Sequence, residues 1–138
     1  MSRVLFVNLP VNDLPASREF FETLGFGFDR RFCEGGAACL IVSEHAYVML
    51  LRRDCFADFV TRPVADAFEA TALTVAISAE DRAAVDRFAD QALEAGATPA
   101  KPPLELGFMY QRTFHDLDGH LWEVVWMDPF GPQSDIRK

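Results

Sequence analysis

The stretch LTVAISAEDRAAVDRFADQALEAG, residues 73–96, predicts a strand followed by an amphipathic helix. Large and small residues alternate over residues 73–77, which is typical of a strand with two different faces. Ser78 and Asp81 have the spacing of a capping box, and Gly96 marks the end of the helix. The apolar residues of the helix recur on one face: Val85, Phe88, Ala89, Ala92 and Leu93.

Two strands complete this half of the chain. Three prolines between residues 99 and 103 predict a loop with at most a short edge strand. Strands are then expected at residues 108–115 and 121–127, joined by a turn at residues 116–119, whose glycine can take a positive φ. The segment therefore has the order strand, helix, short edge strand, strand, strand.

The first half of the chain repeats this order. A strand is expected at residues 5–11, and Asp13 and Pro15 then start a short helix that Gly25 ends. Further strands are expected at residues 26–32, 37–42 and 47–51, the last two joined by a turn at residues 43–45. A short helix at residues 55–60 and a linker at residues 61–71 separate the two halves.

This repeat predicts an α+β fold in which two βαβββ units form a curved eight-stranded mixed sheet around a cup, with the helices outside. We expect one domain over residues 1–138, with unit one at about 3–60, unit two at about 71–129 and a tail at 130–138. Each unit has one apolar sheet face for its helix. The other face must pair with the second unit or enclose something.

Composition excludes several classes of function. The 138 residues include 13 basic and 21 acidic ones, a net charge of −8 that disfavours binding to nucleic acid or to anionic membrane surfaces. No apolar run approaches the roughly 20 residues that span a bilayer, and the N-terminus is typical of a first strand rather than a signal peptide. The three cysteines have no metal or redox spacing, which favours a reducing cytoplasm.

Several motifs, together with the repeat, resemble the vicinal oxygen chelate superfamily, which includes glyoxalase I, bleomycin-resistance proteins, fosfomycin-resistance enzymes and extradiol dioxygenases. They are Val11-Asn12-Asp13-Leu14, Leu24-Gly25-Phe26 and the segment DLDGHLWEV at residues 116–124. The resemblance covers about residues 3–129. Residues 6–11, 47–51 and 107–110 look like a bacterial subgroup called predicted lactoylglutathione lyases.

The resemblance implies a divalent metal in the cup, held by His, Gln or Glu side chains from the first and last strands of each unit. These positions fall on Phe6, Met49, Ala72 and Glu123 in this sequence. Only Glu123 can bind a hard or borderline cation, whereas zinc takes about four N, O or S ligands and magnesium about six oxygens. We therefore predict that the protein has no metal and no cofactor.

Glu123 is the most informative residue of the expected site. On the floor of an apolar cup, burial would disfavour its charged form and prepare it as a general acid or base. The alternative is a half-buried carboxylate paired with a neighbouring Arg or hydroxyl, and a strand shifted by one residue would place Arg112 beside it. We assign the following ligand-binding residues to the cup: Phe6, Asn8, Met49, Thr74, Gln111, Thr113, Leu121 and Glu123.

The favoured function is that of a metal-free cytoplasmic homodimer that binds a small organic molecule in the cup, as the resemblance to the bleomycin-resistance branch implies. The acidic chain favours a cationic or neutral molecule. One alternative is a lyase, isomerase or dioxygenase of the superfamily, either metal-dependent or using Glu123 as its catalytic acid or base. A third is a structural module whose cup is filled by its own side chains.

Overall fold

The computed structural model describes residues 3–32 and 35–130. The chain divides into two compact units, Met1–Asp66 and Ala67–Lys138, and the boundary lies inside the linker expected at residues 61–71. No helix among the described residues is long and apolar enough to span a membrane. The tail expected at 130–138 lies outside the described residues except for Phe130.

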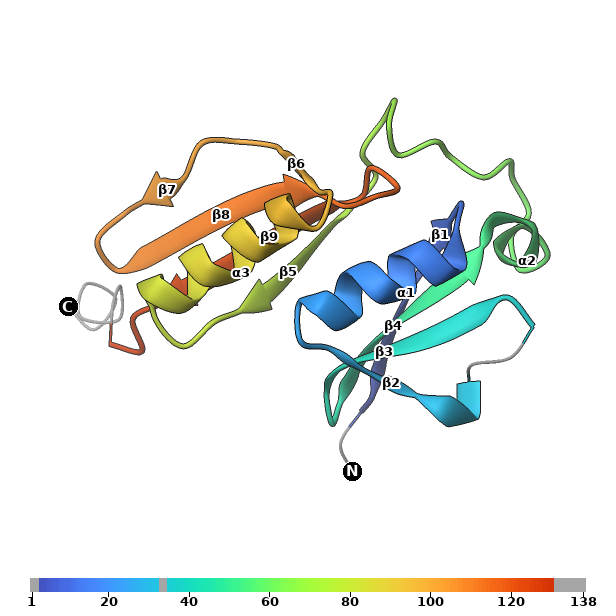
Figure 1. The fold of residues 1–138 in the computed structure, drawn as a ribbon, viewed down its shortest axis with the longest axis horizontal. Coiled ribbons are helices and arrows are strands. Elements are labelled where there is room, and N and C mark those ends of the chain that lie inside the picture. The colour runs from blue at the N-terminus through green and yellow to red at the C-terminus, as the bar shows by residue number, and fades with distance from the viewer. Residues whose placement is uncertain (1–2, 33–34, 131–138) are drawn as a thin grey trace. The chain divides into compact units, whose positions relative to one another are not determined.

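Unit 1 is a four-stranded sheet with helices before and after its hairpin (Figure 1). Its strands have the order β1-β4-β3-β2, with β1 parallel to β4 and the other pairs antiparallel. The elements are β1 (Leu5–Val11), α1 (Leu14–Thr23), β2 (Gly27–Asp29), the 3-10 turn η1 (Arg30–Phe32), β3 (Ala37–Ser43), β4 (Ala46–Arg52) and α2 (Arg53–Ala57).

Unit 2 has the same topology with one additional short strand. Its order is β5-β9-β8-β6, β7 also pairs with β8, and the first strand is again parallel to the last. The elements are β5 (Thr74–Ser78), α3 (Arg82–Glu94), β6 (Thr98–Pro99), β7 (Leu104–Glu105), β8 (Met109–His115) and β9 (Leu121–Met127). The α+β class and the two βαβββ-like units are therefore confirmed. The described strands, however, form a four-stranded and a five-stranded sheet rather than one sheet of eight strands.

Of the two helix N-caps predicted from the sequence, one is confirmed and one is wrong. Asp13 caps α1, and its Oδ1 accepts a hydrogen bond from the backbone N–H of Ala16 at 3.1 Å, as expected. The capping box at Ser78 is wrong. Ser78 is the last residue of β5 and pairs with Val125, so Asp81 is left to cap α3 by accepting from the N–H of Ala84 at 2.7 Å.

Two other elements differ from their expected bounds. The strand expected at residues 26–32 ends at Asp29, because the Asp29 carboxylate accepts from the backbone N–H and the guanidinium of Arg31 and the chain turns into η1. The short helix expected at residues 55–60 is α2, which starts at Arg53 directly after β4. The start of α2 matters because α2 and the residues after it line the candidate site.

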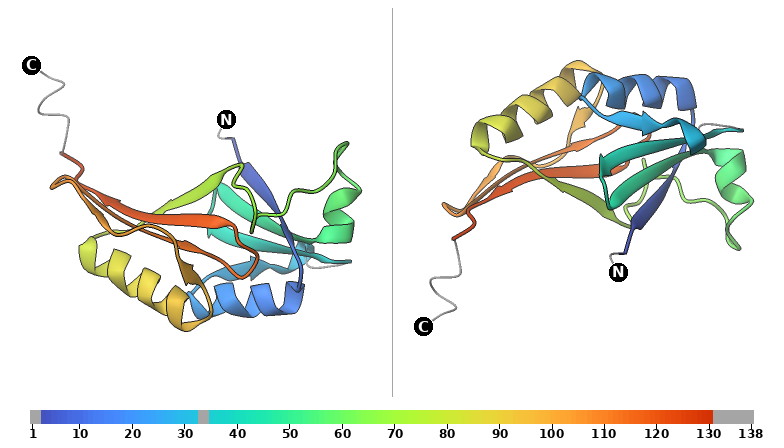
Figure 2. Two further views of the ribbon diagram at one scale, coloured as in Figure 1. Left: turned by 90° about the horizontal axis from the view of Figure 1, so that it is seen from above. Right: turned by 90° about the horizontal axis from the view of Figure 1, so that it is seen from below.

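Each unit buries one sheet face beneath its longer helix. In unit 1, α1 packs against β3 and β4 (Figure 2), and its Phe20 and Phe21 are buried. In unit 2, α3 packs against β8 and β9 through Val85 and Ala89, which are buried with Val124. Side chains alternate along a strand, so the remaining residues of each sheet point to the face opposite the helix.

Candidate functional site

A pocket of about 480 Å³ lies within unit 1, beside the sheet face opposite α1. We call this face the pocket face. Asn8 of β1 and Met49 of β4 are register partners there, so the parallel pairing of the two strands brings them together. The pocket is lined by Asn8, Met49, Leu51, Phe56, Phe59 and Val60.

The far wall of the pocket comes from α2 and the turn after it. β4 runs into α2 without a loop, and α2 contacts both β1 and β4. The Arg53 guanidinium donates to the backbone carbonyls of Val64 at 3.2 Å and Ala65 at 3.3 Å. The Cys55 thiol donates to the carbonyl of Gly35 at 3.1 Å. These bonds hold α2 and the chain after it near the sheet.

The lining is apolar apart from one amide. Five of the six residues are Met, Leu, Phe or Val, and none of the six has a titratable side chain. Asn8 is exposed, and no described residue hydrogen-bonds to its side-chain amide. Many apolar contacts with a single polar group are typical of a small-molecule site, and the volume lies within the usual range of roughly 300–1,000 Å³.

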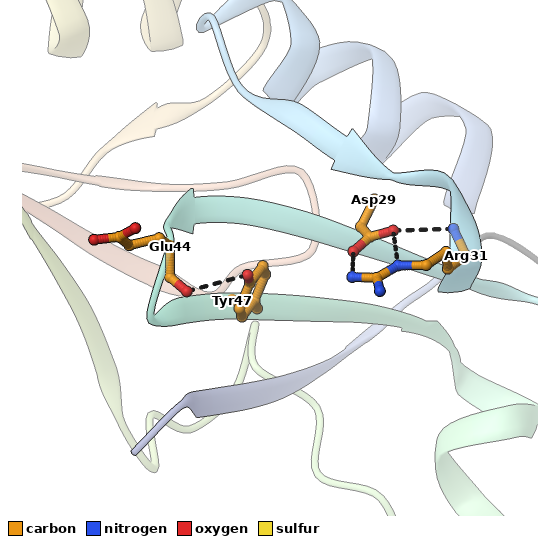
Figure 3. Close-up of polar contacts among 4 residues, drawn as sticks. All are labelled: Asp29, Arg31, Glu44 and Tyr47. Carbon is orange, nitrogen blue, oxygen red and sulfur yellow. Dashed lines mark hydrogen bonds and ion pairs between the residues drawn. The ribbon is translucent and has the colours of Figure 1, made fainter. Parts of the chain in front are cut away.

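An aromatic pair lies next to the pocket on the same face. The Phe6 and Tyr47 rings are stacked, with centroids 5.3 Å apart and planes at 19°. The Tyr47 hydroxyl donates to the carbonyl of Glu44 at 3.2 Å, as Figure 3 shows. This bond turns the hydroxyl toward the β3–β4 turn. Phe6 is 47% exposed, so much of its ring is open to contact.

An ion pair stands at the other edge of the same sheet. Asp29 of β2 accepts from Arg31 Nη2 at 2.7 Å and from Nε at 3.1 Å (Figure 3). The Arg31 guanidinium lowers the pKa of the Asp29 carboxyl, and the carboxylate in turn raises the pKa of Arg31. Asp29, Cys39, Met49 and Asn8 form one row across the sheet. The charges at the β2 end of this row are therefore already matched.

The expected residues of the second half lie on the face of the unit 2 sheet opposite α3. Gln111 Nε2 donates to Glu123 Oε1 at 3.1 Å, and Thr113 is the register partner of Glu123. The Thr113 hydroxyl accepts from the backbone N–H of Lys101 at 2.9 Å. Thr74 and Leu121 are register partners farther along the same face. Gln111 and Thr113 therefore lie on the face opposite α3, whereas their expected role in ligand binding stays a prediction.

The alternative register, with Arg112 beside Glu123, is wrong. Arg112 points to α3, where its Nη1 lies 3.2 Å from Asp86 Oδ1 and 2.8 Å from Asp90 Oδ1. Tyr110, on the same side of β8, donates its hydroxyl to Asp86 at 2.7 Å. The hydrogen-bond partner of Glu123 that the structure records is therefore the neutral amide of Gln111, not a guanidinium.

The turn between β8 and β9 is built around a buried carboxylate. Asp116 Oδ1 accepts from the backbone N–H of Asp118 at 2.9 Å and of His120 at 3.0 Å, and Oδ2 accepts from Trp122 Nε1 at 2.9 Å. Burial raises the pKa of Asp116, although the charge of His120 and the bond from Trp122 act against this shift. With every carboxylate oxygen engaged, Asp116 supports the hairpin rather than an exposed site.

Residues 3–43 match the family model for a bleomycin resistance protein-like N-terminal region. Protein SA1046 from S. aureus, a hypothetical protein, is 23% identical with a TM-score of 0.78, over 91% of this chain and 95% of that chain. A glyoxalase/bleomycin resistance protein/dioxygenase family enzyme from Burkholderia phytofirmans PsJN is 18% identical with a TM-score of 0.75, over 91% and 99%. The chain has the glyoxalase/bleomycin resistance/dioxygenase fold.

This fold also occurs in fosfomycin resistance protein FosX from Mesorhizobium loti, which is 15% identical with a TM-score of 0.69, over 96% of this chain and 98% of that chain. No curated protein sequence matches the chain. At these identities the solved structures establish the fold alone. The subgroup of predicted lactoylglutathione lyases, suggested by short segments of the sequence, stays a prediction.

The residues at the metal positions implied by this fold do not fit a metal. Phe6, Met49 and Ala72 offer no hard donor, which leaves Glu123 alone. Phe6 is the register partner of Tyr47 rather than of Met49, and Ala72 lies before the start of β5. Among the described residues, no group of three or more His, Cys, Asp and Glu side chains could hold a metal ion.

The pocket contains two of the eight expected ligand-binding residues, Asn8 and Met49. Phe6 lies on the same face but in the aromatic pair, and the other five belong to unit 2. The other lining residues include Phe56, Phe59 and Val60, which lie in and after α2 and were not predicted to belong to the site. The sequence pattern that could have revealed them is an apolar cluster just before the linker at residues 61–71. In the structure Phe59 is 78% exposed, and exposed apolar patches often mark binding sites.

Proposed function

We propose that the protein is a member of the glyoxalase/bleomycin resistance/dioxygenase superfamily that binds a small organic molecule in the unit 1 pocket, without a metal. The observation that carries the proposal is the pocket itself, an apolar recess of about 480 Å³ with the free amide of Asn8 at its edge. The match of residues 3–43 to a bleomycin resistance protein-like region supports the same branch of the superfamily.

The absence of suitable donors supports binding over metal-dependent chemistry. The four implied ligand positions supply one carboxylate, and that carboxylate bonds to the Gln111 amide. Elemental analysis after exposure to zinc, nickel and manganese, followed by desalting, tests this part of the proposal. We expect no stoichiometric ion, and one tightly held ion per chain would favour an enzyme instead.

The binding proposal can be tested with Nile red, an uncharged apolar dye whose fluorescence rises in apolar sites. Val60→Trp replaces an isopropyl group in the pocket wall with a bulky indole. Val4→Trp is a matched control, because Val4 is similarly exposed but does not line the pocket. We expect Val60→Trp to weaken dye binding by about tenfold or more, with Val4→Trp unchanged. Equal binding by all three proteins would contradict the proposal.

A further inference from the structure

We infer that the unit 1 pocket selects an uncharged, planar molecule, with the polar group of this molecule at Asn8 and its ring against the Phe6–Tyr47 pair. This inference rests on the proposed binding function and names its ligand class. It combines three observations on the pocket face: the absence of charged side chains among the six lining residues, the free amide, and the stacked aromatic pair.

Charge is the first observation. An ionised group that leaves water needs an opposite charge or several hydrogen bonds, and the six lining residues offer only one amide. Two of the charged side chains beside the lining residues are engaged within the chain. Arg52 binds Asp54 at 2.7 Å through Nε and at 3.0 Å through Nη2, and Arg53 donates to backbone carbonyls. Asp58 and Arg62 are neighbours of the lining in the sequence but do not line the pocket, so the lining itself offers no countercharge to a cation or an anion.

The distribution of charge between the units supports this reading. Unit 1 has seven basic and nine acidic residues, a net charge of −2, whereas unit 2 has six basic and twelve acidic residues, a net charge of −6. The net negative charge from which a cationic ligand was predicted thus belongs mostly to unit 2, whereas the pocket described above lies in unit 1. The composition favoured a cationic or a neutral molecule, and of these two the pocket favours the neutral one.

The Asn8 amide is the second observation. A primary amide has donors on its nitrogen and an acceptor oxygen, so it pairs well with a carboxamide, a lactam or a similar neutral group. Asn is uncommon inside strands, and here it stands on β1 opposite the apolar Met49. Because no described residue binds this amide, it is available to a ligand.

The aromatic pair is the third observation. Phe6 and Tyr47 precede Asn8 and Met49 by two residues on the same two strands, so both pairs share a face and lie about 7 Å apart along the strands. Aromatic rings favour offset stacking or edge contacts with other rings. A flat molecule of two fused rings can therefore reach the Phe6 ring while its polar group meets Asn8.

The test uses three probes of nearly the same shape: naphthamide, which is neutral, naphthoate, which is an anion, and naphthamidine, which is a cation at neutral pH. Binding to the full-length protein is measured by calorimetry or by displacement of Nile red. We expect naphthamide to bind about tenfold or more tightly than either ion. Asn8→Leu, which keeps the size but removes the amide, should remove most of this preference.

Two further variants separate the subsites. Asn8→Asp should reverse the order and make naphthamidine the tightest probe, because it supplies the countercharge that the pocket lacks. Phe6→Ala should weaken all three probes, whereas Phe130→Ala is a control, since Phe130 is 77% exposed and does not line the pocket. Circular dichroism and thermal melting of each variant show whether its fold is intact.

The outcomes distinguish failure of the inference from failure of the proposed function. If naphthamidine or naphthoate binds most tightly to the unmodified protein, or if Asn8→Leu leaves the order unchanged, the pocket binds molecules but the inferred class is wrong. If no probe binds and Val60→Trp leaves Nile red binding unchanged, the pocket is not a binding site and both proposals fall.

Discussion

The side chain of Asp116 shows how one residue can fix a hairpin. It is 5% exposed, and its two oxygens accept three hydrogen bonds from the turn and from the indole of Trp122. Every one of these partners is a donor. An acceptor with full negative charge is therefore the group that the site requires, even though burial disfavours that charge.

We predict that Asp116→Asn destabilises the protein by about 1–3 kcal/mol. The amide nitrogen must face either the Trp122 Nε1 donor or the two backbone N–H groups, so one donor is left unmatched in the first orientation and two in the second. Urea denaturation measures the loss. In the Trp122→Phe background the same change should cost less, because the amide can turn its nitrogen to the vacated side. An Asn variant as stable as the unmodified protein would contradict this account.

Glu123 leads to the opposite expectation. Because its recorded partner is the neutral Gln111 amide, Glu123→Gln should change the free energy of unfolding by less than about 1.5 kcal/mol. The matched control is Arg112→Gln, which removes two carboxylate contacts on the other face of the same sheet and should cost more. Thermal melting compares the two variants. A loss of about 3–5 kcal/mol for Glu123→Gln would instead indicate a buried ion pair.

At the scale of elements, β7 is tied to the start of α3 by one arginine. Arg82 Nε and Nη2 each donate to a Glu105 oxygen at 2.8 Å, Nη2 also reaches the carbonyl of Gly107 at 2.7 Å, and the guanidinium lies 4.5 Å from the Trp126 ring centroid. β7 is only two residues long, so these contacts compensate for its short ladder.

The stabilisation from the Arg82–Glu105 ion pair should depend on pH. Arg82, together with the backbone N–H of Gly107, lowers the pKa of Glu105 from its ordinary 4.5 to about 2. These contacts therefore stabilise the folded state above pH 4.5, and their contribution is lost as the pH falls through about 2. NMR titration of the Glu105 side-chain carboxyl carbon measures the shift. In Arg82→Gln the pKa should move back toward 4.5. A Glu105 carboxyl that titrates near 4.5 in the unmodified protein would show that the pair does not form.

The order of the elements could be predicted from the sequence because each repeat combines alternation, a helical apolar face and glycine stops. Alternation also assigned the faces of β8 correctly, since Tyr110 and Arg112 both reach α3. Ser78 and Asp81 are both good caps, and only the pairing of Ser78 with β9 decides between them. The pocket wall was missed because α2 is held by tertiary bonds from Arg53, which no periodicity reveals.

At the scale of the whole molecule, exposed apolar side chains near the edge strands favour self-association. Leu5 on β1 is 61% exposed, and Leu73, just before β5, is 49% exposed. Edge strands with exposed apolar residues tend to pair with another chain. We predict a homodimer, so light scattering after size exclusion should give about twice the 15.5 kDa of one chain. A mass near 15.5 kDa at micromolar concentration would contradict it.

The parallel pairs β1–β4 and β5–β9 have a consequence for biosynthesis. The sheet of each unit is complete only when its first strand pairs with its last strand. Pairing between strands that are far apart in the sequence is slow in folding. On the ribosome, the first sheet can close once Arg52 has emerged, while the second must wait for β9. The half of the protein that contains the pocket can thus be finished while the other half is still being translated.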